Sequence, residues 1–137
     1  RPVEAAVVAR RLGRVKFMLY GSAEYLASGC ELSFIAYDES VTITPQQAWL
    51  KKQCAGRPVV FFSNDLRIQA ITAAGHAGIA LLPDYLAKEY NLVPVEPGGP
   101  ALTLDIWLSV HEDVRHARHI SAVVDFLISC IEPAYGL

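Results

Sequence analysis

The feature that most constrains the fold is a short apolar run that follows a helix-like segment. Residues 78–82 are almost wholly apolar and are bounded by Pro83. A strand that is apolar on both faces must be covered on both sides, which is typical of parallel sheets flanked by helices. A strand at residues 59–62 and a helix at residues 66–73 precede it, and we expect this βαβ unit to have a right-handed crossover. We therefore predict an α/β domain around a mixed, mostly parallel sheet with flanking helices.

Capping residues and glycines divide the rest of the chain into short elements. Thr44-Pro45-Gln46-Gln47 is a capping-box pattern with proline at the first helical position, and it predicts a helix to about Cys54. Gly29 is placed to end a short helix over residues 23–28 because glycine tolerates the left-handed conformation found beyond helix ends. Further strands are expected at residues 15–20, 33–37 and 92–95, and a further helix at residues 84–89.

The C-terminal third combines two different periods. Apolar and polar residues alternate from Leu102 to Val110, which indicates a strand with one covered face. The next apolar residues fall on one stripe of a helix: Ile120, Val123, Val124, Leu127, Ile128 and Ile131. Leaving these side chains in water would forgo roughly 1.5–3 kcal/mol each. We therefore expect this helix to pack on Val3, Val7 and Val8 or on a second copy of the chain.

Composition excludes several classes of protein. The 137 residues are 53% hydrophobic and 19% charged, which suits one folded domain and not a disordered chain. The net charge of −2 lacks the basic excess of a nucleic-acid-binding domain, so we expect no direct DNA contact from this segment. No apolar run approaches the roughly 20 residues that span a bilayer, so no membrane partner is expected.

Reactive side chains do not assemble into a catalytic pattern. His111, His116 and His119 lack the spacing of a zinc helix and lie among arginines, so we predict no metal site. The three cysteines sit neither in a C-x-x-C arrangement nor at the start of a predicted helix, so none is expected to act as a nucleophile. We predict no catalytic residue and no cofactor.

The turn Ser63-Asn64-Asp65 is the candidate ligand site. It joins the carboxyl end of a strand to the start of a helix, where ligands bind in open α/β sheets. Free N–H groups and the helix dipole would attract a carboxylate, and the Ser63 hydroxyl and Asn64 amide add neutral hydrogen bonds. Asp65 would repel an anion, so we assign it to the helix start. The alternative is that Ser63 or Asn64 only caps the helix.

Five segments of the chain, in order, resemble LysR-type transcriptional regulators. Residues 19–27 are similar to the "ASPEYLA" segment of that family, and residues 74–87 to its "AGxGIALLPDYLA" signature. Residues 92–95, 107–111 and 123–127 follow the order of its closing segments. His76 stands where the family usually has glycine, which affects the expected turn but not the expected fold.

The resemblance implies part of an effector-binding domain with the type II periplasmic-binding-protein fold. Residues 1–16 would then be the end of subdomain one and a crossover, residues 17–110 subdomain two, and residues 111–137 a crossover and the C-terminal helix. The family's effector cleft is lined at positions that match Ser63, Asn64 and Leu66, with Arg1 as a weaker match. The winged helix-turn-helix that contacts DNA in the family has no counterpart in this chain.

These features together predict a sensor rather than an enzyme. A small polar or carboxylate metabolite would bind in a cleft between the subdomains and bias the arrangement of tethered DNA-binding domains. We expect a homo-oligomer in the cytoplasm. The alternative is a solute-binding protein of the same fold that serves transport, although the unpaired cysteines and the lack of a secretion signal argue against it.

Overall fold

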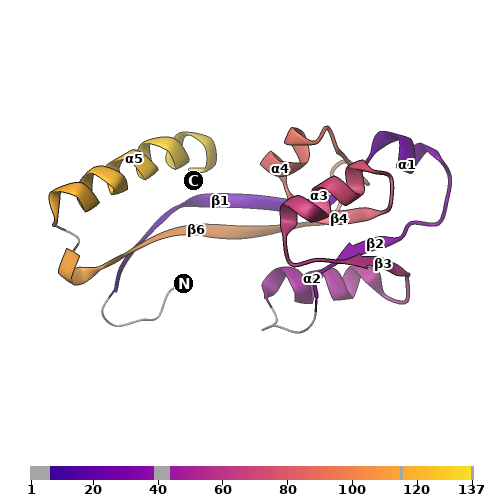
Figure 1. Ribbon diagram of the computed structural model, residues 1–137, viewed down its shortest axis with the longest axis horizontal. Helices are drawn as coiled ribbons and strands as arrows, with labels where there is room; N and C mark the ends of the chain where they lie inside the picture. The colour runs from indigo at the N-terminus through magenta and orange to yellow at the C-terminus, as the bar shows by residue number, and fades with distance from the viewer. Residues whose placement is uncertain (1–6, 39–43, 115, 137) are drawn as a thin grey trace. The chain divides into compact units, whose positions relative to one another are not determined.

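The computed structural model describes residues 7–38, 44–114 and 116–136 (Figure 1). The chain forms two compact units. One consists of Lys16–Leu102, and the other of Arg1–Val15 with Thr103–Leu137. The division predicted from the sequence, at residues 1–16, 17–110 and 111–137, concerns a complete two-subdomain protein and stays a prediction.

A mixed sheet organises the larger unit. Its strands are β1 (Val7–Gly21), β2 (Phe34–Ala36), β3 (Val59–Phe62), β4 (Ile79–Pro83) and β5 (Val93–Pro94), in the spatial order β3-β2-β4-β1-β5. β2 lies parallel to both β3 and β4, whereas β1 lies antiparallel to both β4 and β5. The α/β class with a mixed sheet is confirmed, and its parallel part consists of β3, β2 and β4.

β4 forms the centre of the core. All five of its residues are buried, and Ile79, Leu81 and Leu82 have no exposed surface. The predicted burial on both faces is thus confirmed. Only β2 pairs with β4 in the parallel direction, because the long strand β1 enters the sheet on its other side in the opposite direction.

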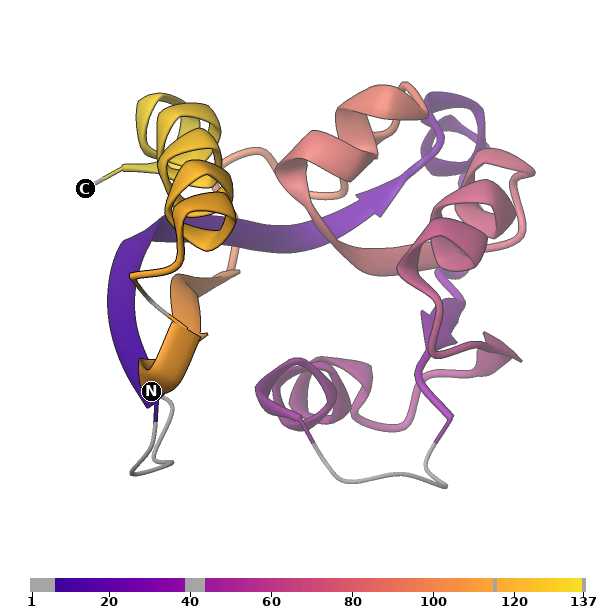
Figure 2. The same cartoon turned by 60° about the vertical axis from the view of Figure 1, so that its left-hand side comes forward.

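The described residues of this unit form four helices. They are α1 (Ala23–Ala27), α2 (Pro45–Cys54), α3 (Leu66–Ala74) and α4 (Asp84–Glu89). Figures 1 and 2 show α2 on the face of the sheet opposite to α3 and α4. The predicted capping box is confirmed: the Gln47 amide N donates to Thr44 Oγ1 at 3.2 Å, and the Thr44 amide N donates to Gln47 Oε1 at 2.8 Å.

In the turn before β4 a histidine, rather than a glycine, takes the left-handed conformation. Gly75 has an ordinary φ of −81°, and His76 instead adopts the left-handed conformation with φ +68°. The His76 ring is held on both sides: Nδ1 lies 2.7 Å from Ser22 Oγ and Nε2 lies 2.9 Å from Glu24 Oε2. Gly78 is required for space, because a Cβ there would lie 2.7 Å from the Ser33 carbonyl oxygen.

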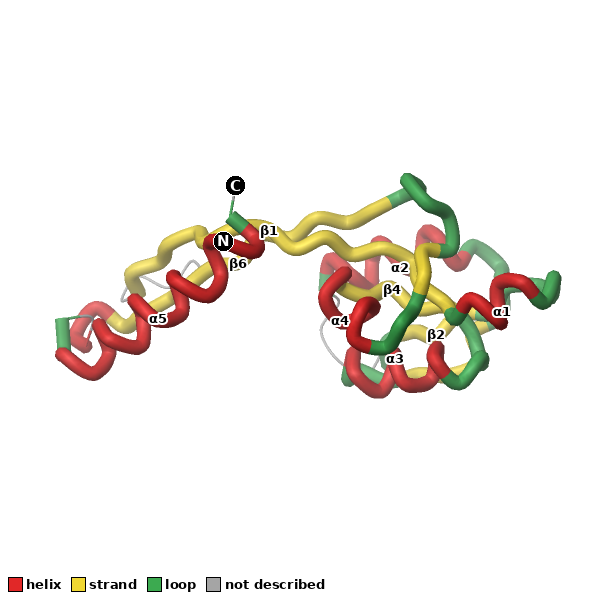
Figure 3. Tube along the Cα trace, turned by 90° about the horizontal axis from the view of Figure 1, so that it is seen from above, coloured by secondary structure: helices red, strands yellow, loops and turns green. Residues whose placement is uncertain are grey.

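The smaller unit contains paired parts of β1 and β6 (Ala101–His111), a 3₁₀ turn at Glu112–Val114, and α5 (Arg118–Tyr135). Figure 3 shows α5 running along the two strands. β1 begins at Val7, so the expected strand over residues 15–20 was too short. Its additional arginines are accommodated because Arg11 and Arg14 lie 3.7 and 3.4 Å from the Asp105 carboxylate on β6.

The apolar stripe of α5 is only partly covered. Its residues are half-buried except Val123, whose exposed fraction is 54%. At the end of the helix Glu132 lies 2.6 Å from Arg10, and the Tyr135 carbonyl approaches Gly13 so closely that a Cβ there would clash. Val3 and the side chain of Val7 lie outside the described residues and Val8 is 37% exposed, so the expected packing partner stays a prediction.

The close approach at Gly78 gives a test of the fold. Gly78→Ala should lower the free energy of unfolding by about 1–3 kcal/mol, because β2 must shift to admit the methyl group. Gly75→Ala is the matched control, since its Cβ would meet neighbours at 3.4–3.6 Å, an ordinary contact distance. Urea unfolding of the two variants measures the difference; equal stability would contradict the packing described here.

Candidate functional site

The turn between β3 and α3 is tied to the end of β2. The Ser63 amide N donates to the Ala36 carbonyl at 2.9 Å, and the Asp38 amide N donates to Asn64 Oδ1 at 2.9 Å. Ser63 Oγ in turn accepts from the Asp65 amide N at 3.1 Å. These bonds use the acceptor oxygen of Asn64 and leave its amide nitrogen for a further partner.

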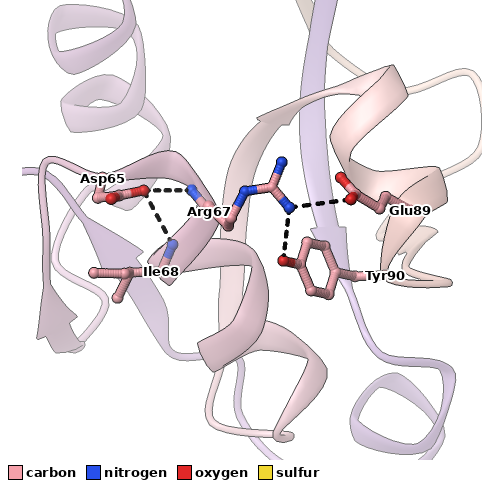
Figure 4. A network of polar contacts seen from close by, with 5 residues as sticks. All are labelled: Asp65, Arg67, Ile68, Glu89 and Tyr90. Atoms are coloured by element: carbon pink, nitrogen blue, oxygen red, sulfur yellow. Dashed lines mark hydrogen bonds and ion pairs between the residues drawn. The ribbon is translucent and has the colours of Figure 1, made fainter.

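Asp65 caps α3. Its Oδ1 accepts from the amide N of Arg67 at 2.9 Å and of Ile68 at 3.3 Å (Figure 4). The assignment of Asp65 to the helix start is confirmed, and the alternative that Ser63 or Asn64 provides the cap is wrong. The expected row of unpaired N–H groups is shorter than predicted, because Asp65 itself occupies two of them. In the described part of the chain the amides of Asn64 and Leu66 have no acceptor.

A shallow pocket opens at this helix start. It is lined by Asn64, Asp65, Leu66, Arg67, Tyr85 and Leu86. The structure thus brings Asn64 and Leu66 together, whereas Ser63 is not among the residues that line the pocket. Arg1 lies outside the described residues. The contributions of Tyr85 and Leu86 were missed by the sequence analysis because they come from α4, whose start also lies at the carboxyl end of a strand.

Arg67 connects α3 to the end of α4. Its Nη1 donates to Glu89 Oε1 at 3.1 Å and to Tyr90 Oη at 2.9 Å, and its guanidinium carbon lies 5.8 Å from the Tyr90 ring centroid (Figure 4). Hydrogen bonds to Glu89 and Tyr90 raise the pKa of Arg67. The guanidinium is therefore engaged by α4. No sequence pattern indicated this pairing, because 22 residues separate Arg67 from Glu89.

The structure also describes the three cysteines and the side chains that could bind a metal. Cys30 and Cys130 are exposed free thiols, and Cys54 is a half-buried one. Burial raises the pKa of the Cys54 thiol, and the charge of Arg57 partly offsets this. Among residues 7–38, 44–114 and 116–136, His, Cys, Asp and Glu side chains form no group of three that could hold a metal. In the same ranges no helix is long and apolar enough to span a bilayer.

The model of the family described as "LysR substrate binding domain" matches residues 1–129. The chain belongs to this family. LysR proteins are transcriptional regulators, and the predicted recognition and fold are thereby confirmed. Among curated proteins no sequence matches the chain.

Solved structures of LysR-family proteins share the fold. The C-terminal domains of a LysR-family protein from Agrobacterium tumefaciens superpose with a TM-score of 0.71 at 14% identity, over 96% of this chain and 69% of that one. A variant of the regulatory domain of AphB from Vibrio vulnificus gives 0.69 at 20% identity, over 94% and 73%. Full-length LysG from Corynebacterium glutamicum, with bound effector arginine, gives 0.69 at 10% identity, over 96% and 48%.

Substitution can separate the two contributions that Asp65 makes to the start of α3: its capping hydrogen bonds and its negative charge. Asp65→Ala should lower the free energy of unfolding by about 1 kcal/mol because the amides of Arg67 and Ile68 lose their acceptor. Asp65→Asn should keep the stability, since asparagine caps helices as well as aspartate does. Thermal unfolding of both variants measures this. Equal loss in both would mean that charge, rather than capping, holds the helix start.

Proposed function

We propose that this LysR-family domain is a ligand sensor that binds a small polar effector at the start of α3, through Ser63, Asn64 and Leu66. The observation that carries the proposal is the pocket at this turn, which is lined by Asn64 and Leu66, whose backbone amides have no acceptor in the described part of the chain. Backbone N–H groups at a helix start favour a carboxylate. The Asn64 side-chain amide supplies a further donor beside them.

The charge of Asp65 narrows the chemistry of the effector. A bare anion would be held close to the Asp65 carboxylate and repelled by it. A molecule that carries both a carboxylate and a cationic group avoids this cost, because its cation can face Asp65 while its carboxylate meets the amides. The arginine bound to LysG is a molecule of that kind, and for this chain we infer the same general class, an amino-acid-like effector.

Effector binding would act by shifting a conformational equilibrium. A ligand that prefers one arrangement of the two subdomains raises its population by the difference in affinity. In the complete regulator this would change how the DNA-binding domains of a cytoplasmic homo-oligomer are presented. DNA contact would come from a winged helix-turn-helix outside these residues, in keeping with the net charge of −2. Family membership does not favour the transport alternative.

Thermal-shift measurements with single amino acids and simple organic acids test the site. A ligand at 100 times its Kd should stabilise the chain by about 2.7 kcal/mol. Asn64→Asp is the sharpest variant: it keeps the oxygen that accepts from the Asp38 amide, removes the side-chain donor and adds a negative charge. We expect this variant to unfold at the temperature of the parent and to lose the stabilisation. Stabilisation of equal size in parent and variant would remove this site from consideration.

A further inference from the structure

Two side chains of opposite charge line the pocket at the start of α3. They are Asp65 and Arg67, and the other described lining residues are uncharged. Figure 4 shows the Arg67 side chain extending away from Asp65 and toward Glu89 on α4. Among the described residues the ion pair of Arg67 is with Glu89 and not with Asp65. The two charges at the pocket are therefore balanced separately.

Glu89 offsets the charge of Arg67. Its Oε1 accepts from Arg67 Nη1 at 3.1 Å, and Tyr90 Oη accepts from the same nitrogen at 2.9 Å. The guanidinium carbon also lies 5.8 Å from the centroid of the Tyr90 ring. Neither Glu89 nor Tyr90 is among the described residues that line the pocket. The cation of Arg67 is thus held beside a carboxylate that lies outside the pocket wall.

Asp65 has no such counter-charge. Its Oδ1 accepts from the amides of Arg67 and Ile68, which are neutral groups. Within the described part of the chain no cationic side chain forms an ion pair with it. The balance at the pocket is consequently negative, because one carboxylate is uncompensated and the charge of the one arginine is offset. A ligand of net negative charge is disfavoured there relative to a neutral ligand of the same shape.

We propose that Glu89 is a specificity-determining residue of the effector pocket, which selects a net-neutral amino acid over an acidic one because Glu89 neutralises Arg67. The inference rests on the proposed function, since it concerns the effector that binds at the start of α3. Glu89 acts through Arg67 and does not line the pocket itself. The Arg67 and Glu89 side chains are 56% and 52% exposed, so solvent screens the pair and the expected selectivity is modest.

Free L-glutamine and free L-glutamate are the probes that test this inference. They have nearly the same size and shape and differ by one charge. Calorimetric titration at neutral pH and low salt gives the two dissociation constants. The parent should bind L-glutamine about fivefold more tightly than L-glutamate, a factor of the size that exposed charge pairs produce. Glu89→Gln removes the charge but keeps an oxygen that can accept from Arg67 Nη1, and in this variant the ratio should fall to about one.

A matched control distinguishes this local effect from a change in the net charge of the chain. Glu31→Gln removes the same charge from an exposed residue that precedes the amino end of β2, and the ratio should stay at that of the parent. Salt provides a second readout. Addition of about 0.5 M NaCl should lower the ratio of the parent toward one, because salt screens exposed charges. A merely structural role of the Arg67–Glu89 pair would change both affinities alike and leave their ratio unchanged.

Three results would overturn the inference. They are an unchanged ratio in Glu89→Gln, an equal fall of the ratio in Glu31→Gln, and equal affinity of the parent for the two probes. In each of these cases an amino acid still binds, so the proposed function stands. If the parent binds neither probe, the inference fails as well, and the thermal-shift screen of amino acids and organic acids decides the proposed function separately.

Discussion

The complete burial of β4 is the constraint from which the rest of the larger unit follows. A strand without exposed surface needs cover on both faces, and on one of these faces α3 and α4 supply it through small and apolar residues such as Ala70, Ala73 and Leu86. Both helices begin immediately after strands that run parallel to each other in the sheet. Their starts consequently emerge at the same edge of the sheet, and this is why residues 64–67 of one helix and 85–86 of the other line one pocket.

At that edge of the sheet, groups of the chain itself already bind the helix start and the nearby arginine. Asp65 supplies an internal carboxylate to the first turn of α3, and Glu89 and Tyr90 engage the guanidinium of Arg67. The two most obvious attractions for an anion, the helix start and the arginine, are thus largely satisfied within the protein. What remains for a ligand is neutral hydrogen bonding from amides, a setting in which shape and donor placement matter more than net charge.

Local signals in the sequence predicted the elements well. The capping box at Thr44–Gln47 and the apolar run before Pro83 each depend on residues that are neighbours in the sequence. The helix and the buried strand that they form could therefore be predicted without knowledge of the tertiary structure. Asn64 was proposed because a strand-to-helix turn has a known place in open sheets, and Leu66 because of the family resemblance. Both line the pocket at the start of α3, where the cap at Asp65 limits the free amides. The reverse direction of β1 and the Arg67–Glu89 pairing depend on contacts between distant segments, which periodicity and capping rules do not encode.

The contacts of His76 tie the loop before β4 to the start of α1. Ser22 Oγ accepts from the Tyr25 amide N at 3.0 Å and lies 2.7 Å from His76 Nδ1. The other ring nitrogen, Nε2, lies 2.9 Å from Glu24 Oε2. A glycine would adopt the left-handed backbone at this position with less strain, yet it would leave the first turn of α1 without its link to the loop before β4. The imidazole thus accepts a less favourable backbone conformation and in return forms a side-chain link between two segments 54 residues apart.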